Sequence, residues 1–555
     1  MNLLTLALSL LGVWFLSNTL AFWSNVSKAR KSNLPILYAP FNTKNPIWMV
    51  LSVALRPLIY RILPARLYDE IKPHLFGWEF TDKYALHARI GPAFLAVSSG
   101  EIMFVCADPN LAQEILSRTR DFHALSMTGV IMGIFGPNLI TLSGPAWSRH
   151  RRIVAPALNE RISAAVWAES RSQADHMLAY SLAQPKGHNP TPLSGLRSIA
   201  FNVLGNIGYG QPQPWSPEPA RIAGGQKLSY FGCVQAVVEH IVPAAILPTW
   251  FLRMPFLPKA MDAVAQAMTE LPAHTKAMLA AERAAGAEKG NIMSMLVRLS
   301  DQEARDGKKE GGDLPKGAQW LSEEEISGNL FLFTVAGFDT TANTLAYALT
   351  LLTAQPEWQN WLAEELDAVF SSATDDADYA TFTRLPRLLA VMHETLRLFP
   401  PLLHLSRENP AWTTLTTGAA EYRIPPHAQC YINIMTLHTD PAHWGSDSLD
   451  FRPSRWLPAD HKPGMPEPLI TPKKGTWYPW SGGPRVCPGM KMSQVEFVGV
   501  LSTLLEGAKV EVARLEGEGV EEAKDRLRRL MADSQPKLTL QMKRLQEVQF
   551  RWVRR

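Results

Sequence analysis

Cysteine and charge are both scarce in this sequence. Only four cysteines occur among the 555 residues, at positions 106, 233, 430 and 487, and no two of them form a CxxC pair. This wide spacing excludes a disulfide framework and indicates a reducing compartment, with one cysteine as a ligand and three as packing residues. Charged residues make up 19% of the chain and the formal net charge is +4, so composition gives no argument for nucleic acid as a partner. The chain also lacks an internal repeat, and its broad class is a large globular enzyme with an apolar attachment.

The first residues have the pattern of a membrane anchor. Residues 3–23 are predominantly apolar and uncharged, and about 20 helical residues cross a hydrocarbon core. Lys28, Arg30 and Lys31 follow, and positive charge stays on the cytoplasmic side of a membrane. A cleaved signal peptide is the alternative, but the apolar run is long and its start lacks basic residues. We therefore expect three parts: an anchor with its basic flank over residues 1–31, a linker or membrane-surface segment over 32–64, and a single catalytic domain over 65–555.

A second apolar block covers residues 46–64. Arg56, Pro57 and Arg61 interrupt it, so we expect it to lie on the membrane surface, with a second span as the alternative. A third block, residues 241–257, carries Trp250 and Phe256 among several prolines. Core packing is one interpretation; the other, a loop that dips into the membrane near a substrate entrance, is implied only by the family resemblance described below.

The catalytic domain is expected to be mostly helical. Ser322 and Glu325 have the spacing of a capping box, which predicts the start of a strong helix. Residues 301–319 are charged and glycine-rich, which predicts a solvated loop. Short runs of β-favouring residues predict strands at 94–97, 102–106 and 430–434.

The most informative motif is the glycine-rich loop from Trp480 to Gly489, which contains Cys487. A thiolate in such a loop can bind iron while backbone N–H groups point at the sulfur, and Arg485 is spaced to reach a haem propionate. Thiolate ligation favours O–O cleavage. Together with Gly483, these residues resemble the haem-binding signature of the cytochrome P450 superfamily, Phe-x-x-Gly-x-Arg-x-Cys-x-Gly. Trp480 replaces the usual Phe, and its indole N–H either donates to the sulfur or bonds elsewhere while the ring fills space.

A second motif lies inside the helix that Ser322 is expected to begin. Its residues are Ala336, Gly337, Asp339 and Thr340. An acid followed by threonine is unusual in mid-helix because both side chains compete for backbone hydrogen bonds. Gly337 lets the helix bend or open, which leaves room for a small ligand. The motif resembles the oxygen-activating motif of the same family, which implies that Thr340 holds a water chain and Asp339 feeds it protons from solvent. A helix irregularity without chemistry is the alternative.

A third match is structural. Glu394 and Arg397 share a helix face at i and i+3 within an amphipathic stretch over residues 388–399. In the family this pair meets an arginine of a Phe-x-Pro-x-Arg segment, which here is Arg455. The resemblance implies that the three residues lock the fold and take no part in catalysis.

Three more residues are similar to those that bind the haem propionates in the family. Trp147 and Arg151 are four residues apart and therefore share a helix face. Arg407 matches a strand arginine with the same role. With Arg485, the resemblance implies three cations for two carboxylates, a task that suits the planar donor fork of arginine.

The combined resemblance covers the chain from about residue 35 onward, and it implies a fold and an activity. The fold is mainly α with small β-sheets (α+β), in a single catalytic domain behind an N-terminal transmembrane helix. The activity is that of a fungal-type, membrane-bound haem-thiolate monooxygenase that inserts one oxygen atom from O2 into a lipophilic substrate, by hydroxylation or epoxidation, in specialised metabolism. The implied cofactor is haem b (iron protoporphyrin IX), with Cys487 as the axial ligand of the iron.

The resemblance also implies partners and a location. Electrons come from NADPH through a separate flavoprotein reductase, with cytochrome b5 as a further partner, and the enzyme contacts membrane lipid. The implied location is the endoplasmic reticulum membrane, single-pass, with the catalytic domain in the cytosol. Basic residues beside the haem motifs are candidates for the reductase-binding face: Arg149, Arg152, Lys473, Lys474 and Lys491. Five segments are expected to line the substrate pocket: residues 122–135, 241–257, 331–338, 402–405 and 532–536.

Two other functions remain open at this point. A haem-thiolate isomerase or dehydratase would rearrange an oxygenated substrate without a reductase. Such relatives often lose the acid–threonine pair, whereas Asp339 and Thr340 are both present. A non-catalytic haem protein that binds or senses a ligand would need neither this pair nor a reductase face.

Overall fold

The fold is described from a computed structural model of the chain. The structure describes residues 3–217, 228–285, 291–309, 320–371, 378–418 and 420–555. Contacts divide the chain into two compact units. Unit 1 comprises residues 1–125, 402–450 and 472–486, and unit 2 comprises residues 126–401, 451–471 and 487–555.

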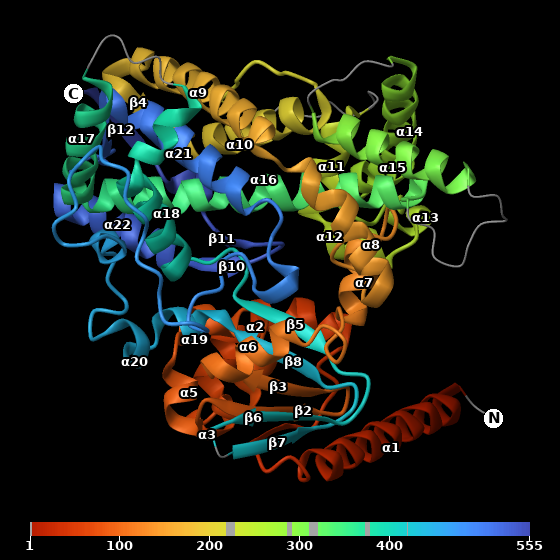
Figure 1. The fold of residues 1–555 in the computed structure, drawn as a ribbon. Coiled ribbons are helices and arrows are strands. Elements are labelled where there is room, and N and C mark those ends of the chain that lie inside the picture. The colour runs from red at the N-terminus through yellow and green to blue at the C-terminus, as the bar shows by residue number, and fades with distance from the viewer. Residues whose placement is uncertain (1–2, 218–227, 286–290, 310–319, 372–377, 419) are drawn as a thin grey trace. The chain divides into compact units, whose positions relative to one another are not determined.

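Unit 1 contains most of the β-structure (Figure 1). Its strands are β1 (Ile36–Ala39), β2 (Ala93–Ser98), β3 (Ile102–Cys106), β5 (His404–Glu408), β6 (Thr413–Thr417), β7 (Ala420–Ile424) and β8 (Gln429–Asn433). Its helices are α1 (Leu3–Ala29), α2 (Pro46–Ile62), α3 (Ala65–Ile71), α4 (Trp78–Asp82), α5 (Ala85–Ile90), α6 (Pro109–Ser117), α19 (Ile434–Thr439) and α20 (Pro441–Trp444).

A mixed five-stranded sheet in the order β1-β2-β3-β8-β5 organises unit 1. β2 and β3 pair antiparallel, and β3 pairs parallel with β8 although more than 300 residues separate them along the chain. β2 and β3 are buried throughout, which explains why both read as continuous apolar runs. The three strands predicted from β-favouring residues are confirmed as β2, β3 and β8. The sheet places Arg407 on the edge strand β5, opposite Cys430 of β8.

Helix α1 covers the segment for which we expected a membrane-spanning anchor. Among the residues that the structure describes, no helix combines the length and the apolar character needed to cross a membrane, so the predicted transmembrane helix is not supported. Polar side chains interrupt the apolar run, and Asn18 accepts a hydrogen bond from Ser99 at 3.0 Å. Near its end, Asn25 donates to the carbonyl of Ser98 at 3.0 Å, and Val26 is buried. The last turns of α1 therefore pack on the sheet of unit 1.

Unit 2 is mainly helical. Its helices are α7 (Ser126–Met132), α8 (Gly144–Val154), α9 (Glu160–Ala183), α10 (Pro192–Tyr209), α11 (Tyr230–Glu239), α12 (Ile241–Ile246), α13 (Thr249–Leu252), α14 (Lys259–Ala285), α15 (Ile292–Lys309), α16 (Glu323–Ala354), α17 (Pro356–Phe370), α18 (Pro386–Leu398), α21 (Met490–Glu506) and α22 (Val520–Ala532). Its strands are β4 (His188–Asn189), β9 (Ala508–Val512), β10 (Ser534–Pro536), β11 (Leu540–Met542) and β12 (Phe550–Arg554), in two small sheets.

Helix α16 forms the centre of unit 2 and crosses it from side to side (Figure 1). It contacts α10, α11, α17, α18, α21 and α22. The predicted capping box is present: the Ser322 side chain accepts from the backbone of Glu325, and the Glu325 side chain accepts from the backbone of Ser322. From residue 341 to residue 354 every residue of α16 is buried. A helix that is buried on all sides is typical of the core of a large domain.

The prediction of a loop over residues 301–319 is wrong in its first half. Residues 301–309 continue α15, and residues 310–319 lie outside the described part of the chain. Glutamate, arginine and lysine are good helix formers, and they extend α15 through Gly307 to Lys309.

Candidate haem and oxygen-activation site

Cys487 is the first residue of the last segment of unit 2, three residues before α21 begins. It is exposed, whereas the other three cysteines are buried. Surrounding protein atoms desolvate the thiol and raise its pKa, but the backbone N–H of Gly489 and the charge of Arg151 both lower that pKa. Gly489 is also the N-cap of α21, and a helix N-terminus favours negative charge. These contacts offset part of the rise that desolvation causes in the pKa of the thiol, and the thiolate is the form that binds iron.

The part of the loop before Cys487 belongs to unit 1. Gly483 has a φ of +61°, and a Cβ at this position would lie 2.5 Å from the carbonyl oxygen of Leu116, so only glycine fits. Arg485 follows in the same turn, and Trp480 is half-buried. Unit 1 therefore presents Arg485 from a loop whose backbone shape is fixed by a glycine.

Arg485 and Arg407 lie near each other in unit 1. Desolvation lowers the pKa of the Arg407 guanidinium to about 10. Desolvation, followed by repulsion from Arg407, lowers the pKa of Arg485 to about 10 as well. Two partly desolvated cations side by side need a shared anion. A haem propionate fits this need, since guanidinium groups bind carboxylates through two parallel hydrogen bonds.

Trp147 and Arg151 both lie on α8, as their spacing predicts. Trp147 is buried. Desolvation lowers the pKa of Arg151, and the neighbouring Cys487 raises it. On another side of α8, His150 lies 3.1 Å from the carboxylate of Glu325, and Arg149 also pairs with Glu325. These contacts fix α8 to the first turn of α16 and so hold Trp147 and Arg151 in place.

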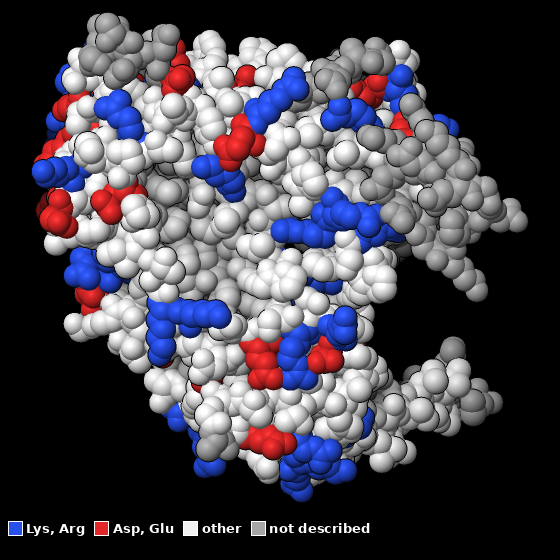
Figure 2. All heavy atoms as spheres, viewed as in Figure 1, with Lys and Arg blue, Asp and Glu red and all other residues white. Residues whose placement is uncertain are grey.

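Two of the basic residues expected on the reductase-binding face, Arg149 and Lys491, contact other residues of unit 2. The Arg149 guanidinium binds Glu325 and also donates to the carbonyl of Trp320 at 2.6 Å, so it is held within unit 2. Lys491 lies over the ring of Phe382 at 4.2 Å from the ring centroid. Figure 2 shows basic and acidic side chains spread over the face that it draws, with uncharged areas between them.

The oxygen-activation motif forms one face of α16. Ala336, Gly337 and Thr340 are half-buried, whereas Phe338 and Asp339 between them are buried. The Thr340 hydroxyl donates to the carbonyl of Ala336 at 2.6 Å. α16 does not open at Gly337, since the helix continues without a break to residue 354; the other expected possibility, a bend at Gly337, stays a prediction.

Asp339 faces away from this surface into a polar cluster of unit 2. Its Oδ1 lies 3.1 Å from Nη2 of Arg197, and its Oδ2 accepts a hydrogen bond from Thr539 at 2.5 Å. Asn343 donates to Thr539 at 2.8 Å and accepts from Arg197 at 3.3 Å. The guanidinium of Arg197 also lies over the ring of Phe338. The cluster joins α10, α16 and the segment before β11.

Sequence reasoning did not find Arg197 or Thr539. A signal for Arg197 exists, because it is the only charged residue of α10. No signal marks Thr539, which lies 200 residues from Asp339 along the chain.

The structure brings Glu394, Arg397 and Arg455 together in unit 2. Both oxygens of Glu394 accept from Arg397, each at 2.8 Å, and Oε1 also accepts from Arg455 at 2.9 Å. Trp456 donates to Oε2 at 3.0 Å, and the backbone N–H of Arg452 donates to Oε1 at 2.9 Å. Glu394 and Arg397 are fully buried. This dense pairing is what a buried carboxylate requires.

The chain was compared with known proteins. The cytochrome P450 family model matches residues 74–539. A "Phomenoic acid biosynthesis cluster cytochrome P450 monooxygenase" of Leptosphaeria maculans is 30% identical over 94% of each chain. The cytochrome P450 monooxygenase prx9 of Penicillium rubens is 25% identical over 89% of this chain and 88% of the relative.

Solved structures show the same fold. The haem domain of cytochrome P450DA has a TM-score of 0.65 at 17% identity and covers 86% of this chain and 93% of its own. The cytochrome P450 CYP102L1 has a TM-score of 0.62 at 18% identity and covers 84% of this chain and 93% of its own. Members of the family use haem, O2 and electrons from a redox partner, and they act on lipophilic substrates. The chain therefore belongs to the cytochrome P450 family and is a haem-thiolate monooxygenase with the mainly helical fold of that family.

Proposed function

We propose that this enzyme inserts one oxygen atom from O2 into an unactivated C–H or C=C bond of a lipophilic substrate in specialised metabolism. The observation that carries the proposal is the face of α16 that includes Ala336, Gly337 and Thr340. It sets a hydroxyl beside a half-exposed surface, one residue away from a carboxylate that is fully hydrogen-bonded. An enzyme that only rearranges its substrate has no need for this proton-handling arrangement.

The residues that the family resemblance assigns to haem b would hold it here. Cys487 would bind the iron, and the backbone N–H of Gly489 and the charge of Arg151 lower the pKa of its thiol against the effect of desolvation. In unit 2, Trp147 and Arg151 of α8 would bind a propionate, and in unit 1 Arg407 and Arg485 would do the same. When bound, the haem supplies the site at which O2 is reduced and cleaved.

Thr340 binds a water molecule through a hydrogen bond to its hydroxyl oxygen. Its proton is engaged by the carbonyl of Ala336, so its oxygen lone pairs are free to accept a hydrogen bond from a water on the half-exposed face. With haem and O2 in place, a water held by Thr340 would be available as a proton donor on this face of the helix.

Asp339 supplies the proton through its cluster. Both of its oxygens are occupied, one by Arg197 and the other by Thr539. Because the Arg197 side chain is 23% exposed, a proton from solvent reaches Asp339 most directly on that side. The contact between Arg197 and Asp339 must loosen before Asp339 can accept and pass on the proton.

The electron source and the pathway are parts of the same proposal. Electrons come from NADPH through a separate flavoprotein reductase, with cytochrome b5 as a second donor, and Arg152, Lys473, Lys474 and Lys491 contribute to the docking face. Specialised metabolism is supported by the relative named for the phomenoic acid biosynthesis cluster.

NADPH consumption tests the proposed reaction. The haem-loaded protein is combined with a fungal reductase and screened against lipophilic compounds by their binding spectra. The binders are then incubated with NADPH and O2. The proposal expects oxygenated product that forms only when reductase and NADPH are present. Product that forms equally well without them would instead identify an isomerase or dehydratase, and binding without any product would identify a ligand-binding haem protein.

We also propose that the enzyme works at the cytosolic face of the endoplasmic reticulum membrane. Support comes from α1, whose first half exposes apolar side chains such as Leu10, Trp14 and Phe15, and from Lys28, Arg30 and Lys31 near its end. Fractionation of cells that express the full chain or a chain without residues 1–17 tests this proposal, because the shortened chain keeps the contacts of Asn18, Asn25 and Val26 with unit 1. It expects the full chain in the microsomal fraction and the shortened chain largely in the soluble fraction. Equal distribution of the two would contradict it.

A further inference from the structure

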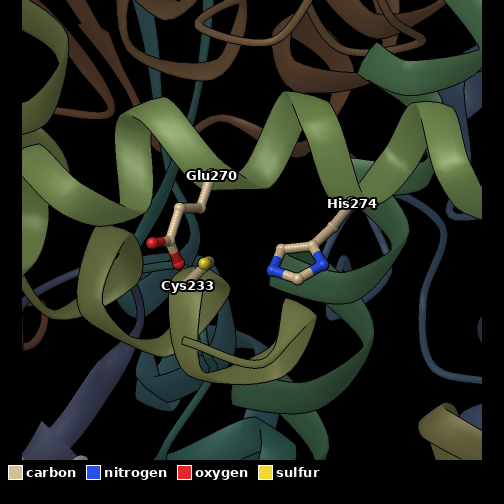
Figure 3. Close-up of side chains that lie close together, drawn as sticks. All are labelled: Cys233, Glu270 and His274. Atoms are coloured by element: carbon tan, nitrogen blue, oxygen red, sulfur yellow. The ribbon is translucent and has the colours of Figure 1, made fainter. Parts of the chain in front are cut away.

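A cysteine, a glutamate and a histidine converge between two helices of unit 2, apart from the site described above. Cys233 lies on α11, and Glu270 and His274 lie one turn apart on α14 (Figure 3). The i, i+4 spacing puts both α14 side chains on one face, and α11 packs against that helix. One donor atom from each residue lies within 4.8 Å of the other two.

This donor set matches the chemistry of zinc. Zn²⁺ binds thiolate sulfur, imidazole nitrogen and carboxylate oxygen, in tetrahedral sites. A thiolate and a carboxylate balance the two charges of the ion, while the imidazole binds as a neutral ligand. The resulting site is electrically neutral, which suits the buried position of Cys233.

Without a metal, the buried Cys233 thiol beside the Glu270 carboxylate keeps its proton. Binding of Zn²⁺ would replace this proton with the metal, so that one proton is released for each Zn–S bond formed.

The backbone of Leu228 orients two of the three side chains. The N–H of Leu228 donates to Glu270 at 2.9 Å, and its carbonyl oxygen lies 2.7 Å from Nε2 of His274. These contacts hold the carboxylate and the imidazole close to Cys233. Metal binding through Nε2 would shift the ring proton to Nδ1, and a water or the Leu228 carbonyl would complete the fourth position.

We propose that Cys233, Glu270 and His274 form a zinc site that ties α11 to α14. The helix that carries Cys233 also contacts α16. Tyr230, one turn before Cys233 on α11, has its hydroxyl 3.4 Å from Oγ1 of Thr334 and 3.4 Å from the hydroxyl of Tyr209. Zinc therefore fixes the helix that packs on α16 just before Ala336, and it acts on stability and helix motion without entering the oxygen chemistry.

Zinc titration of the full-length, haem-loaded protein tests this inference. The protein is treated with a chelator and dialysed, and haem content is checked by absorption so that loss of haem is not mistaken for loss of zinc. Calorimetric titration with Zn²⁺ should show one ion per chain, with proton release seen as a dependence of the heat on the buffer. Elemental analysis after dialysis should give the same stoichiometry.

Variants identify the ligands. Cys233→Ala, Cys233→Ser and His274→Gln should each weaken zinc binding by roughly tenfold or more, provided that their haem content and circular dichroism match the wild type. Glu239→Gln and His240→Gln, on α11 or at its end but outside the cluster, are the matched controls and should bind zinc like the wild type. Zinc should raise the unfolding temperature of the wild type and the controls but not of the ligand variants.

Cobalt provides a readout that does not depend on folding energy. Difference spectra after Co²⁺ addition should show a sulfur-to-metal charge-transfer band in the wild type, and Cys233→Ala should lack it. No zinc retained by the wild type, or equal zinc affinity in Cys233→Ala and His240→Gln, would overturn the proposal. The three side chains would then serve only to hold Leu228 between α11 and α14.

Discussion

Both carboxylate oxygens of Asp339 have a partner, and these contacts restrict the directions in which the side chain can turn. Arg197 and Thr539 each bind one oxygen, so the buried charge is compensated and the side chain cannot turn toward Thr340 without losing a partner. The Thr340 hydroxyl, in contrast, donates its hydrogen bond to the carbonyl of Ala336 and keeps its oxygen lone pairs available as acceptors. Under the proposed function, these neighbouring residues of α16 have different tasks: Asp339 passes on protons from the side of Arg197, and Thr340 holds water on the half-exposed face.

We predict that Thr340→Ala leaves haem and substrate binding largely intact and diverts electrons into peroxide. Without the hydroxyl, water is no longer held in place to protonate bound oxygen in order. The measurement is peroxide and product per NADPH consumed. Thr350→Ala is the matched control, because Thr350 makes the same bond to the carbonyl four residues before it but is buried away from the half-exposed face. If Thr340→Ala and the wild type form the same amount of product per NADPH consumed, Thr340 does not have this role.

For Cys487, we predict that Cys487→Ser abolishes the strongly red-shifted Soret band of the reduced carbon monoxide complex. A soft thiolate gives that band, and a hydroxyl or water ligand does not. The spectrum is recorded on protein with measured haem content, and Cys233→Ser serves as the control that should keep the band. A Cys487→Ser protein that retains both haem and band would show that another residue binds the iron.

At the scale of elements, long-range contacts decide the geometry of the site. The sequence correctly predicts the start of α16, because a capping box is a local signal. It also predicts β2, β3 and β8 from short runs of β-favouring residues, and α18 from its amphipathic pattern. It does not predict that α10 and the segment before β11 both reach Asp339, since no local pattern encodes contacts between residues 142 and 200 positions apart. It also misreads residues 301–309, where helix-forming charged residues precede a glycine-rich run.

The cluster around Glu394 links α18 to residues 452–456, and we predict that Arg455→Ala destabilises the protein by about 3–5 kcal/mol. The reason is that a buried carboxylate loses one of its charged partners. Chemical denaturation followed by circular dichroism, together with haem content, measures this. Arg528→Ala is the control: Arg528 pairs with Asp525 on the surface, both side chains are about half exposed, and such pairs contribute about 0–1 kcal/mol. Similar losses in the two variants would show that the Glu394 cluster is not a structural lock.

On the scale of the whole molecule, a buried histidine makes stability depend on pH. Burial lowers the pKa of His393 to about 3, so the native state keeps this imidazole neutral while the unfolded chain binds a proton below its ordinary pKa of about 6.5. Because the unfolded state binds more protons in this window, stability falls as pH falls from about 6.5 toward 3.

We predict that His393→Phe flattens this part of the pH dependence. Phenylalanine keeps a ring against Trp456, which His393 contacts at 5.0 Å between ring centroids, but it has no proton to bind. Unfolding free energies measured at several pH values between about 4 and 7 check this. His427→Asn, at an exposed position with a φ of +58° that asparagine tolerates, should keep the wild-type slope. An unchanged slope in His393→Phe would contradict the assignment.

The fate of the oxygen atoms from O2 tests the central claim most directly. The haem-loaded enzyme is supplied with reductase, NADPH and a binding substrate under O2 labelled with the heavy oxygen isotope, and the product is examined by mass spectrometry. A monooxygenase predicts one heavy atom in each product molecule and the other in water, with one NADPH consumed per product when coupling is complete. Product without label, or product formed at the same rate without NADPH, would contradict the account.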